Sequence, residues 1–387
     1  MVRGPCRAAG DSVARGSWGA GAPGGWSQAG TAAPATDACV RDPSTHRNTK
    51  ASPQHRDRNY DNNNQYKQHS RLLGRQAPSM NRRSAEPSPS YVTEQINLAS
   101  TDLDRRSTAD ILRIINDEDK TVPAAVEREI PRIATAADAI HAALAAGGRL
   151  FYVGAGTSGR LGIIDAAECP PTFGTDPELV QGIISGGEPA VFRAREGAED
   201  DPEQAGRDLL ARALSPRDVV VGLSASGRTP YVLGALEAAK RVGAVTIAVS
   251  CNPGSPLSQR ADISIEPVVG PEVVTGSTRM KAATAEKLVL NMLSTTVMVK
   301  LGRVSSNLMV DLRTGSAKLV RRAKRIISLT TGVSDSDAAK ALEAAGGHVK
   351  AAIVMTGLGV DLPEAQRLLD AANGRLTDAL EAAKRSP

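Results

Sequence analysis

A short loop pattern occurs twice in the sequence, each time between a run of apolar residues and a segment that can form a helix. The first loop, Gly154–Arg160, follows Leu150–Val153, and the second, Gly222–Thr229, follows Val219–Val221. Both contain the pattern Gly-x-(Gly/Ser)-x-Ser-Gly-Arg. A strand–loop–helix arrangement directs backbone N–H groups and a helix N-terminus toward an anion, and the Ser and Thr hydroxyls add further donors. The repeat therefore predicts an α/β fold with an anion site.

Each loop taken alone also fits an ordinary tight turn, in which glycine relieves backbone strain. The first loop matches the G-x-G-x-x-G pattern of dinucleotide sites, but such a site would need an acidic residue about 20 positions later, at the end of the second strand. The second strand is expected to end at Ser185 and is followed by Gly-Gly instead. Two hydroxyl-rich loops suit a terminal phosphomonoester better than a pyrophosphate, so a sugar phosphate is the preferred ligand.

Strands and helices alternate through the middle of the chain. Apolar runs predict strands at Leu150–Val153, Leu179–Ile184, Val219–Leu223, Val245–Ser250 and Ile263–Ile265. Helices between them imply an α/β class fold, a doubly wound parallel sheet with helices on both faces. In open sheets of this kind ligands bind beyond the carboxyl ends of the strands, where both glycine loops lie.

The chain divides into three parts. Residues 1–91 are rich in small, polar and Arg residues without an apolar period, so they predict a disordered tail to which we assign no function. Residues 92–312 contain the sheet, together with long helices at about Ala124–Ala145 and Ser277–Lys300. Residues 313–387 predict a small C-terminal helical bundle, with helices at Ala317–Thr331, Asp335–Ala345, Val349–Met355 and Leu362–Ala372.

Composition argues against several kinds of partner. The four cysteines form no CxxC pair and have no His partner at metal spacing, which predicts free thiols in a reducing cytoplasm and no metal site. The excess of Arg lies in the tail, and the balanced charge of the remainder predicts no nucleic-acid partner. No apolar stretch is long enough to span a bilayer, so no membrane partner is expected. HExxH, GxSxG and Walker motifs are absent.

Three acidic clusters lie close to the loops in sequence. In the first, Asp165–Pro171, the two prolines are expected to end the helix that the first loop begins, which places Glu168 near a helix C-terminus. The helix dipole there favours the protonated carboxyl, which suits a general acid. The alternative is an ordinary exposed surface glutamate.

The other two clusters are less specific. Arg195–Asp201 contains Glu196 and Glu199, and its spacing alone favours a solvated acidic linker that also caps the helix beginning at Pro202. In the third cluster, Pro271–Lys281, Ser277 or Thr278 is expected to cap the long helix that follows, and their hydroxyls could also contact a ligand.

Taken together, these motifs resemble those of the N-acetylmuramic acid 6-phosphate etherase family of sugar-isomerase (SIS) domain proteins. The resemblance runs from about Thr93 to the C-terminus. It implies a cofactor-independent lyase, a cytoplasmic homodimer that cleaves the D-lactyl ether of N-acetylmuramic acid 6-phosphate in cell-wall sugar recycling. The matching segments are Ile115–Pro123, Gly154–Arg160, Asp165–Thr172, Glu196–Asp200, Ala225–Tyr231, Ser250–Ser255, Gly270–Lys281 and Asn307–Asp311.

The same resemblance implies residue roles. Glu168 is the proton donor to the leaving group, Glu199 is the base and Glu196 contacts sugar hydroxyls. The phosphate is held by Thr157, Ser158, Ser224, Ser226 and Thr229. Ser158 and Glu168 are expected about 15 Å apart along one helix, farther than carbon 6 is from carbon 3. Either the helix stops earlier, the chain folds back, or Glu168 serves the partner subunit's site, which is the preferred hypothesis.

Two other functions use the same architecture. One is a non-catalytic sugar-phosphate-binding regulatory protein of the glucokinase regulatory protein type. The other is an aldose–ketose isomerase, which also uses a carboxylate base. The presence of both Glu168 and Glu199 favours the lyase over the regulator, because a sensor needs neither an acid nor a base.

Overall fold

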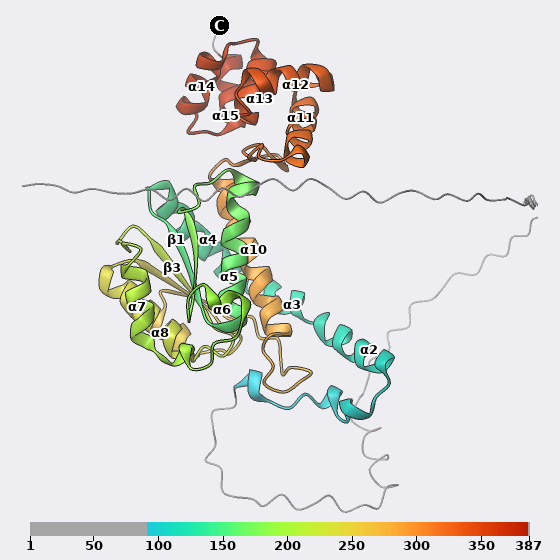
Figure 1. Ribbon diagram of the computed structural model, residues 1–387, viewed down its shortest axis with the longest axis vertical. Coiled ribbons are helices and arrows are strands. Elements are labelled where there is room, and N and C mark those ends of the chain that lie inside the picture. The colour runs from blue at the N-terminus through green and yellow to red at the C-terminus, as the bar shows by residue number, and fades with distance from the viewer. Residues whose placement is uncertain (1–90, 386–387) are drawn as a thin grey trace, which may run out of the picture. The chain divides into compact units, whose positions relative to one another are not determined.

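The computed structural model describes residues 91–385, so the predicted tail lies outside the described residues except for Tyr91. The centre of the fold is a five-stranded parallel sheet in the order β2-β1-β3-β4-β5 (Figure 1). The strands are β1 (Leu150–Gly154), β2 (Val180–Ile184), β3 (Val219–Leu223), β4 (Val245–Val249) and β5 (Ile263–Ile265). The predicted doubly wound parallel sheet is confirmed, with strand ends within a residue or two of those expected.

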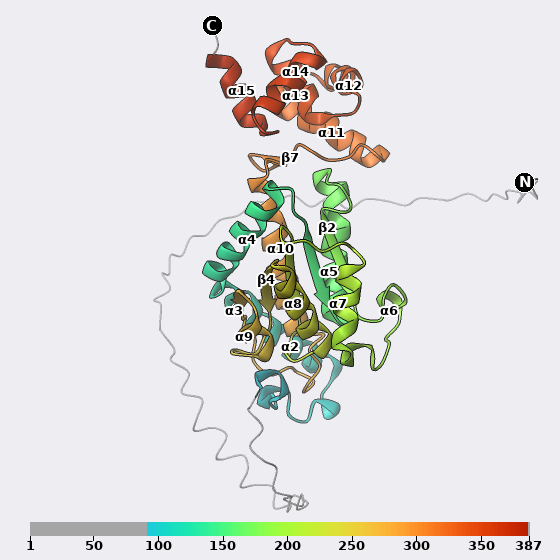
Figure 2. The same cartoon turned by 90° about the vertical axis from the view of Figure 1, so that its left-hand side faces the viewer.

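Helices cover both faces of the sheet because alternate side chains of each strand point to opposite faces. In β1, Leu150 and Tyr152 join one apolar cluster, and Phe151 and Val153 join another. The first cluster packs against α4 (Ile130–Ala145), α5 (Gly156–Phe173) and α10 (Lys281–Lys300). The second packs against α7 (Pro202–Leu210), α8 (Pro230–Val242) and α9 (Pro256–Arg260). Figure 1 shows α7 and α8 on the other side of the sheet from α10, and this side faces the viewer in Figure 2.

Short elements precede and connect these layers. The segment before the sheet contains η1 (Val92–Glu94), η2 (Leu98–Ser100), η3 (Leu103–Arg105), α2 (Thr108–Asp119) and α3 (Val122–Glu127). The expected single helix from Ala124 to Ala145 is therefore wrong. The helix is interrupted between α3 and α4, and Pro131 lies in the first turn of α4. After β2 come α6 (Pro189–Phe192) and η4 (Ala198–Asp200). No helix among residues 91–385 has the length and apolar character needed to cross a bilayer.

The start of α10 also differs from expectation. The helix begins at Lys281, after Ser277 and Thr278, and no side chain of its N-cap residue caps it. Instead the buried carboxylate of Glu272 accepts the backbone N–H groups of Lys281 and Ala282, at 3.0 and 2.9 Å. A carboxylate there satisfies orphan donors and complements the positive end of the helix dipole.

The C-terminal helices form a bundle with its own apolar core. It follows the small hairpin of β6 (Val304–Ser305) and β7 (Leu308–Met309) and contains α11 (Ala317–Thr331), α12 (Asp335–Ala344), α13 (Val349–Leu358), α14 (Leu362–Ala371) and α15 (Leu376–Arg385). The predicted bundle is confirmed, but α15 was not anticipated.

A repeat inside the bundle explains this fifth helix. Leu342-Glu-Ala-Ala-Gly-Gly-His-Val349 and Leu369-Asp-Ala-Ala-Asn-Gly-Arg-Leu376 make the same turn. Their leucine carbonyls accept the N–H groups of Gly347 (2.8 Å) and Gly374 (2.7 Å). The turn that leads from α12 to α13 thus recurs between α14 and α15, and the sequence repeat is the signal that would have predicted α15.

Candidate functional site

The first glycine loop leaves the N-terminus of α5 open. The N-cap residue, Ala155, makes no side-chain capping bond. Gly154 and Gly159 lie so close that a Cβ on Gly154 would be 2.6 Å from the Gly159 nitrogen, so there is no room for a side chain at Gly154. Thr157 is half-buried and Ser158 is buried in the first turn of the helix. This end of α5 therefore provides free backbone donors of the kind that bind anions.

The Ser158 hydroxyl contacts a residue that sequence reasoning missed. Its Oγ lies 2.9 Å from Oε1 of Glu286, which is fully buried on α10. Burial raises the pKa of Glu286 to about 8. Among the described residues, its Oε2 atom has no hydrogen-bond partner. The sequence held one signal: Glu286 occupies the apolar face of α10, at helical spacing from the buried residues Val289 and Leu293.

The second glycine loop gathers three of the predicted phosphate ligands. Ser224 Oγ lies 2.9 Å from Thr229 Oγ1 and 3.4 Å from Ser226 Oγ. The Gly227 N–H donates to Ser224 Oγ at 3.1 Å. Gly227 is required, because its φ is +67° and an added Cβ would lie 2.2 Å from Ser255 Oγ. Thr229 is the N-cap residue of α8, and its side chain makes no capping bond.

Residues from two distant segments clamp the second loop. The buried Asn252 donates from Nδ2 to the Ala225 carbonyl (3.1 Å) and to Thr93 Oγ1 (3.0 Å). The guanidinium of Arg228 lies 3.9 Å from the centre of the Tyr91 ring and forms a 3.4 Å ion pair with Glu94. Sequence reasoning did not predict these contacts, because most of them join positions more than 100 residues apart.

The first loop and the second acidic cluster line one cavity of about 210 Å³. Its walls include Gly156 and Arg160 from the loop side, Ser185 after β2, and both Glu196 and Glu199. Ser185 Oγ donates to the Ala198 carbonyl and so ties η4 to the end of the sheet. The structure therefore brings Glu199, Glu196 and the N-terminus of α5 together.

Neighbouring residues complete this arrangement. Arg160 donates to the carbonyls of Ala190 (2.7 Å) and Val191 (2.9 Å), which fixes α6 beside the cavity. Asp201 accepts the N–H groups of Glu203 and Gln204 and caps α7, as expected for this cluster. Glu196 and Glu199 are exposed, but they are more than a solvated linker because they line the cavity.

Glu168 lies elsewhere. Helix α5 continues through Pro170 and Pro171 to Phe173 and ends at Gly174 (φ +65°), so the expectation that the prolines stop it is wrong. The reason is packing: Ala166 and Cys169 are buried against the sheet and hold the last turns helical. Glu168 is therefore not at the C-terminus of the helix, and the helix dipole gives no support for its role as a general acid.

The continuous helix also decides how Glu168 relates to the loop. Glu168 is exposed and lies about 15 Å along α5 from Ser158. It is not among the residues that line the cavity with Glu199. Because α5 neither stops early nor turns back before Glu168, two of the three explanations for this separation are removed.

Comparison with known proteins supports the sequence resemblance. The model of the glucokinase regulatory protein N-terminal SIS domain matches residues 132–240, and that of the SIS domain matches residues 201–296. The N-acetylmuramic acid 6-phosphate etherase of Symbiobacterium thermophilum is 59% identical over 269 residues, 70% of this chain and 89% of that protein. That of Clostridium beijerinckii is 53% identical over 289 residues, 75% of this chain and 95% of that protein. The chain belongs to the N-acetylmuramic acid 6-phosphate etherase family.

This etherase family member also has a weaker similarity to solved structures. An Escherichia coli CFT073 protein in complex with A5P is 18% identical, with 52% of this chain and 97% of that chain covered and a TM-score of 0.38. A phosphoheptose isomerase from Francisella tularensis is 19% identical, with 49% and 98% covered and a TM-score of 0.38. These likenesses are too distant to support an inference about function.

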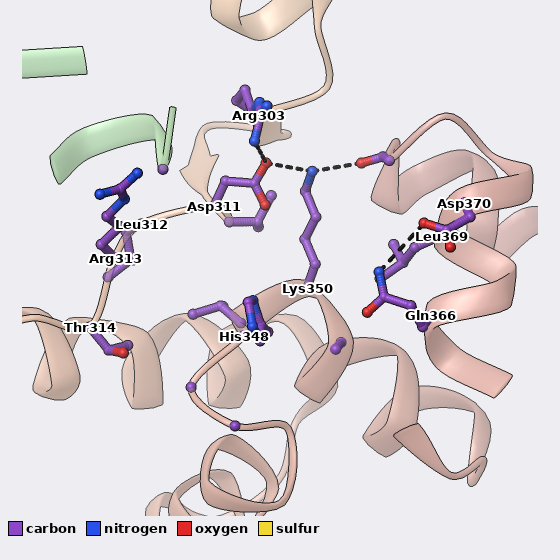
Figure 3. A pocket seen from close by; sticks show the side chains of 17 residues that line it. Arg303, Asp311, Leu312, Arg313, Thr314, His348, Lys350, Gln366, Leu369 and Asp370 are labelled. Atoms are coloured by element: carbon purple, nitrogen blue, oxygen red, sulfur yellow. Dashed lines mark hydrogen bonds and ion pairs between the residues drawn. The ribbon is translucent and has the colours of Figure 1, made fainter. Parts of the chain in front are cut away.

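A larger cavity of about 570 Å³ lies beside the bundle and contains none of the predicted site residues (Figure 3). Three of its charged groups are paired with one another. Lys350 Nζ donates to Asp311 Oδ2 and to the Gly374 carbonyl, each at 2.6 Å, and Arg303 donates to the same carboxylate at 3.2 Å. We interpret these contacts as structural, because they hold the turn before α15 in place.

The described part of this etherase family member shows no grouping of three or more His, Cys, Asp or Glu residues that could hold a metal ion. Cys169 and Cys251 are free thiols, as expected, and both are buried. Cys6 and Cys39 lie outside the described residues.

Proposed function

We propose that this protein cleaves the D-lactyl ether of N-acetylmuramic acid 6-phosphate to give N-acetylglucosamine 6-phosphate and D-lactate. The observation that carries the proposal is the cavity in which Glu199 and Glu196 meet the open N-terminus of α5. A carboxylate beside an anion site is what proton abstraction from a sugar phosphate needs. The relatives that are 53–59% identical are etherases by name, which supports the same substrate.

The reaction proceeds on the ring-opened sugar. The carboxylate of Glu199 removes the proton on carbon 2, which the neighbouring aldehyde makes acidic. The electron pair forms the carbon 2–carbon 3 double bond as the carbon 3–oxygen bond breaks, and Glu168 gives a proton to the departing lactate. Water then adds to carbon 3 and a proton returns to carbon 2. One residue must start ionised and the other protonated, so the two carboxyl groups need different environments.

The two loops hold the phosphate in this proposal. Gly154 of β1 pairs in register with Leu223 of β3, so both loops leave the same edge of the sheet from neighbouring strands. In this strand order the edge beyond β1 and β3 is the topological switch point, the usual ligand position. Thr157 and Ser158 from the first loop and Ser224, Ser226 and Thr229 from the second are the proposed donors. Glu196 contacts the sugar hydroxyls.

Glu168 is proposed to act in the site of a second copy of the chain within a cytoplasmic homodimer. Its position on a continuous helix, away from its own cavity, supports this assignment. Ile164 lies one turn earlier on the same face of α5 and is 48% exposed, which suits a face that a second subunit covers. The buried free thiols suit a reducing compartment.

Subunit mixing tests the shared site. Glu168→Gln and Glu199→Gln proteins are each expected to be inactive, and mixing them under subunit exchange should restore about a quarter of wild-type activity, because half the dimers are hybrids with one intact site. No recovery in dimers proven to have exchanged would argue against a shared site.

The activity itself is tested by incubating the purified protein with N-acetylmuramic acid 6-phosphate in oxygen-18 water. D-lactate together with label on carbon 3 of the glucosamine product is the expected result. Saturable sugar-phosphate binding without lactate would favour the regulatory alternative, and a ketose product would favour an isomerase.

A further inference from the structure

A buried acid on α10, which no step of the proposed reaction uses, contacts the first glycine loop. Glu286 Oε1 lies 2.9 Å from Ser158 Oγ, and Glu286 has no exposed surface. Ser158 is in turn one of the donors proposed to hold the phosphate. A carboxyl group that touches a phosphate ligand from behind can help or oppose phosphate binding, depending on whether it carries a charge.

The two protonation states of Glu286 impose different hydrogen bonds on Ser158. An ionised carboxylate only accepts, so the Ser158 O–H must point toward it, and the hydroxyl turns its lone pairs toward the phosphate. A protonated carboxyl can donate its own O–H to Ser158 Oγ, which leaves the Ser158 hydrogen free for a phosphate oxygen. The ionised form also sets a negative charge in a poorly solvated position next to a dianion.

We propose that Glu286 is a positioning residue that works as a neutral acid, turning the Ser158 hydroxyl toward the substrate phosphate, and that its ionisation disables the first loop. The proposal rests on the proposed function, since it requires a phosphate at Ser158.

The surroundings of Glu286 favour the neutral form. Burial is the main reason that its pKa rises to about 8, and only the Ser158 bond opposes it. The Cys251 thiol is near enough to interact, but burial raises its pKa well above its ordinary value, so it is neutral. The charged groups on and around α10 are engaged elsewhere, in the pairs Lys281–Glu118, Lys287–Asp165, Lys300–Asp138 and Arg303–Asp311 and in the contact of Glu272 with the start of α10.

The direction of the pH effect follows from this. Glu286 is neutral at pH 7 and loses its proton as the pH passes about 8. The substrate phosphate has a second pKa near 6 and is already a dianion over this range. KM should therefore rise about tenfold between pH 7 and pH 9, because only the protonated form of the free enzyme binds well. Over the same pH range kcat should change much less, since the bound phosphate keeps Glu286 protonated.

The experiment compares KM and kcat for lactate release from pH 6.5 to pH 9 in wild-type protein and in Glu286→Gln. The amide keeps the size of the side chain, can donate to Ser158 and cannot ionise. We expect Glu286→Gln to have a KM within about threefold of wild type at pH 7 and to lose the rise above pH 8. An unchanged rise in Glu286→Gln would overturn the proposal.

Asp165→Asn is the matched control. Asp165 is also a buried carboxyl, on α5 and facing α10, and one of its oxygens has no hydrogen-bond partner in the part of the chain that the structure describes. Burial raises its pKa, but it contacts Ser294 and Lys287 of α10 rather than the loop. Its variant should keep the wild-type KM profile. If Glu286→Gln does not fold, as judged by its thermal melt, Glu286→Met provides a second neutral side chain, and a KM rise that persists in it overturns the proposal equally.

Failure of the proposed function has a different signature. It would appear as no lactate from wild-type protein at any pH. The same pH series would then be run with N-acetylglucosamine 6-phosphate as a binding probe. A Kd that rises above pH 8 in wild-type protein but not in Glu286→Gln supports the positioning role. The same rise of Kd with pH in both proteins contradicts it.

Discussion

The two glycine loops share a sequence pattern but differ in what surrounds their hydroxyl groups. In the first loop Ser158 contacts a buried acid from a distant helix, and the end of α5 is open to a cavity. In the second loop Ser224 bonds to Thr229 and lies near Ser226, and Asn252 holds the loop from behind. The shared pattern does not give the same backbone, because α5 begins inside the first loop at Gly156, whereas α8 begins only after the second loop at Pro230. Tertiary contacts decide how each loop is used.

The arginine that ends each pattern makes the same point. Arg160 and Arg228 were part of the motif that suggested anion binding. Arg160 instead donates to the carbonyls of α6, and Arg228 stacks on Tyr91 and pairs with Glu94. Each arginine therefore holds a covering segment against its loop. We propose that the first loop serves both the chemistry and the phosphate, and that the second loop serves the phosphate alone.

The largest expected effect separates these two roles. Glu199→Gln, beside the first loop, should lower kcat by about 10²–10⁴-fold with little change in KM, because it removes a general base. Ser224→Ala, in the second loop, should raise KM by about tenfold or more through loss of a hydrogen bond to a charged phosphate. Steady-state lactate release measures both. Glu203→Gln, an exposed residue on α7, is the control, and equal kcat losses in the first two variants would remove the distinction.

The next effect concerns backbone rather than chemistry. Gly227→Ala should cost about 2–4 kcal/mol of unfolding free energy, because φ is +67° and the new Cβ would meet Ser255 Oγ at 2.2 Å. Gly156→Ala in the first loop has φ +54° with no atom within 4 Å of the new Cβ, so its cost should be about 1 kcal/mol. Urea unfolding followed by circular dichroism measures both. Equal costs would show that the second loop is no more constrained than the first.

Sequence alone could predict the parts of this fold that local pattern determines. Apolar runs and glycine turns located all five strands of the parallel sheet, and both copies of the repeated loop follow neighbouring strands at one edge of that sheet, as expected. Glu196 and Glu199, carried over by resemblance, do line a cavity with the first loop. These features depend on residues that are close together in the chain.

The missed features depend on contacts between distant residues. Prolines 170 and 171 would end an isolated helix, but burial of Cys169 against the sheet keeps α5 intact. Glu272 replaces Ser277 as the cap of α10 because the preceding loop folds back onto the helix. Glu286 reaches Ser158 across 128 positions. A local pattern carries no information about such pairings.

A smaller effect is expected for the clamp of the second loop. Asn252→Ala leaves the buried Ala225 carbonyl and the Thr93 hydroxyl without their Nδ2 donor, which should cost about 1–3 kcal/mol. Asn291→Ala is the control, because Asn291 is exposed and contacts only Lys287 in the described structure. Thermal melts compare the two. A cost for Asn252→Ala no larger than for Asn291→Ala would mean that the clamp does not stabilise the loop.

The smallest effects should distinguish the two arginines. Arg160→Ala removes two partly buried hydrogen bonds to α6 and should cost about 1–2 kcal/mol, whereas Arg228→Ala removes an exposed ion pair and a ring contact worth less than about 1 kcal/mol. Because Ala190 also lines the cavity with Glu199, Arg160→Ala should lower kcat a few-fold and speed amide exchange in α6 and η4. Arg228→Ala should leave kcat unchanged and speed exchange only near Tyr91–Glu94. Faster exchange in η4 of Arg228→Ala would show that the two loops are mechanically coupled, and the division between a catalytic and a rigid loop would no longer hold.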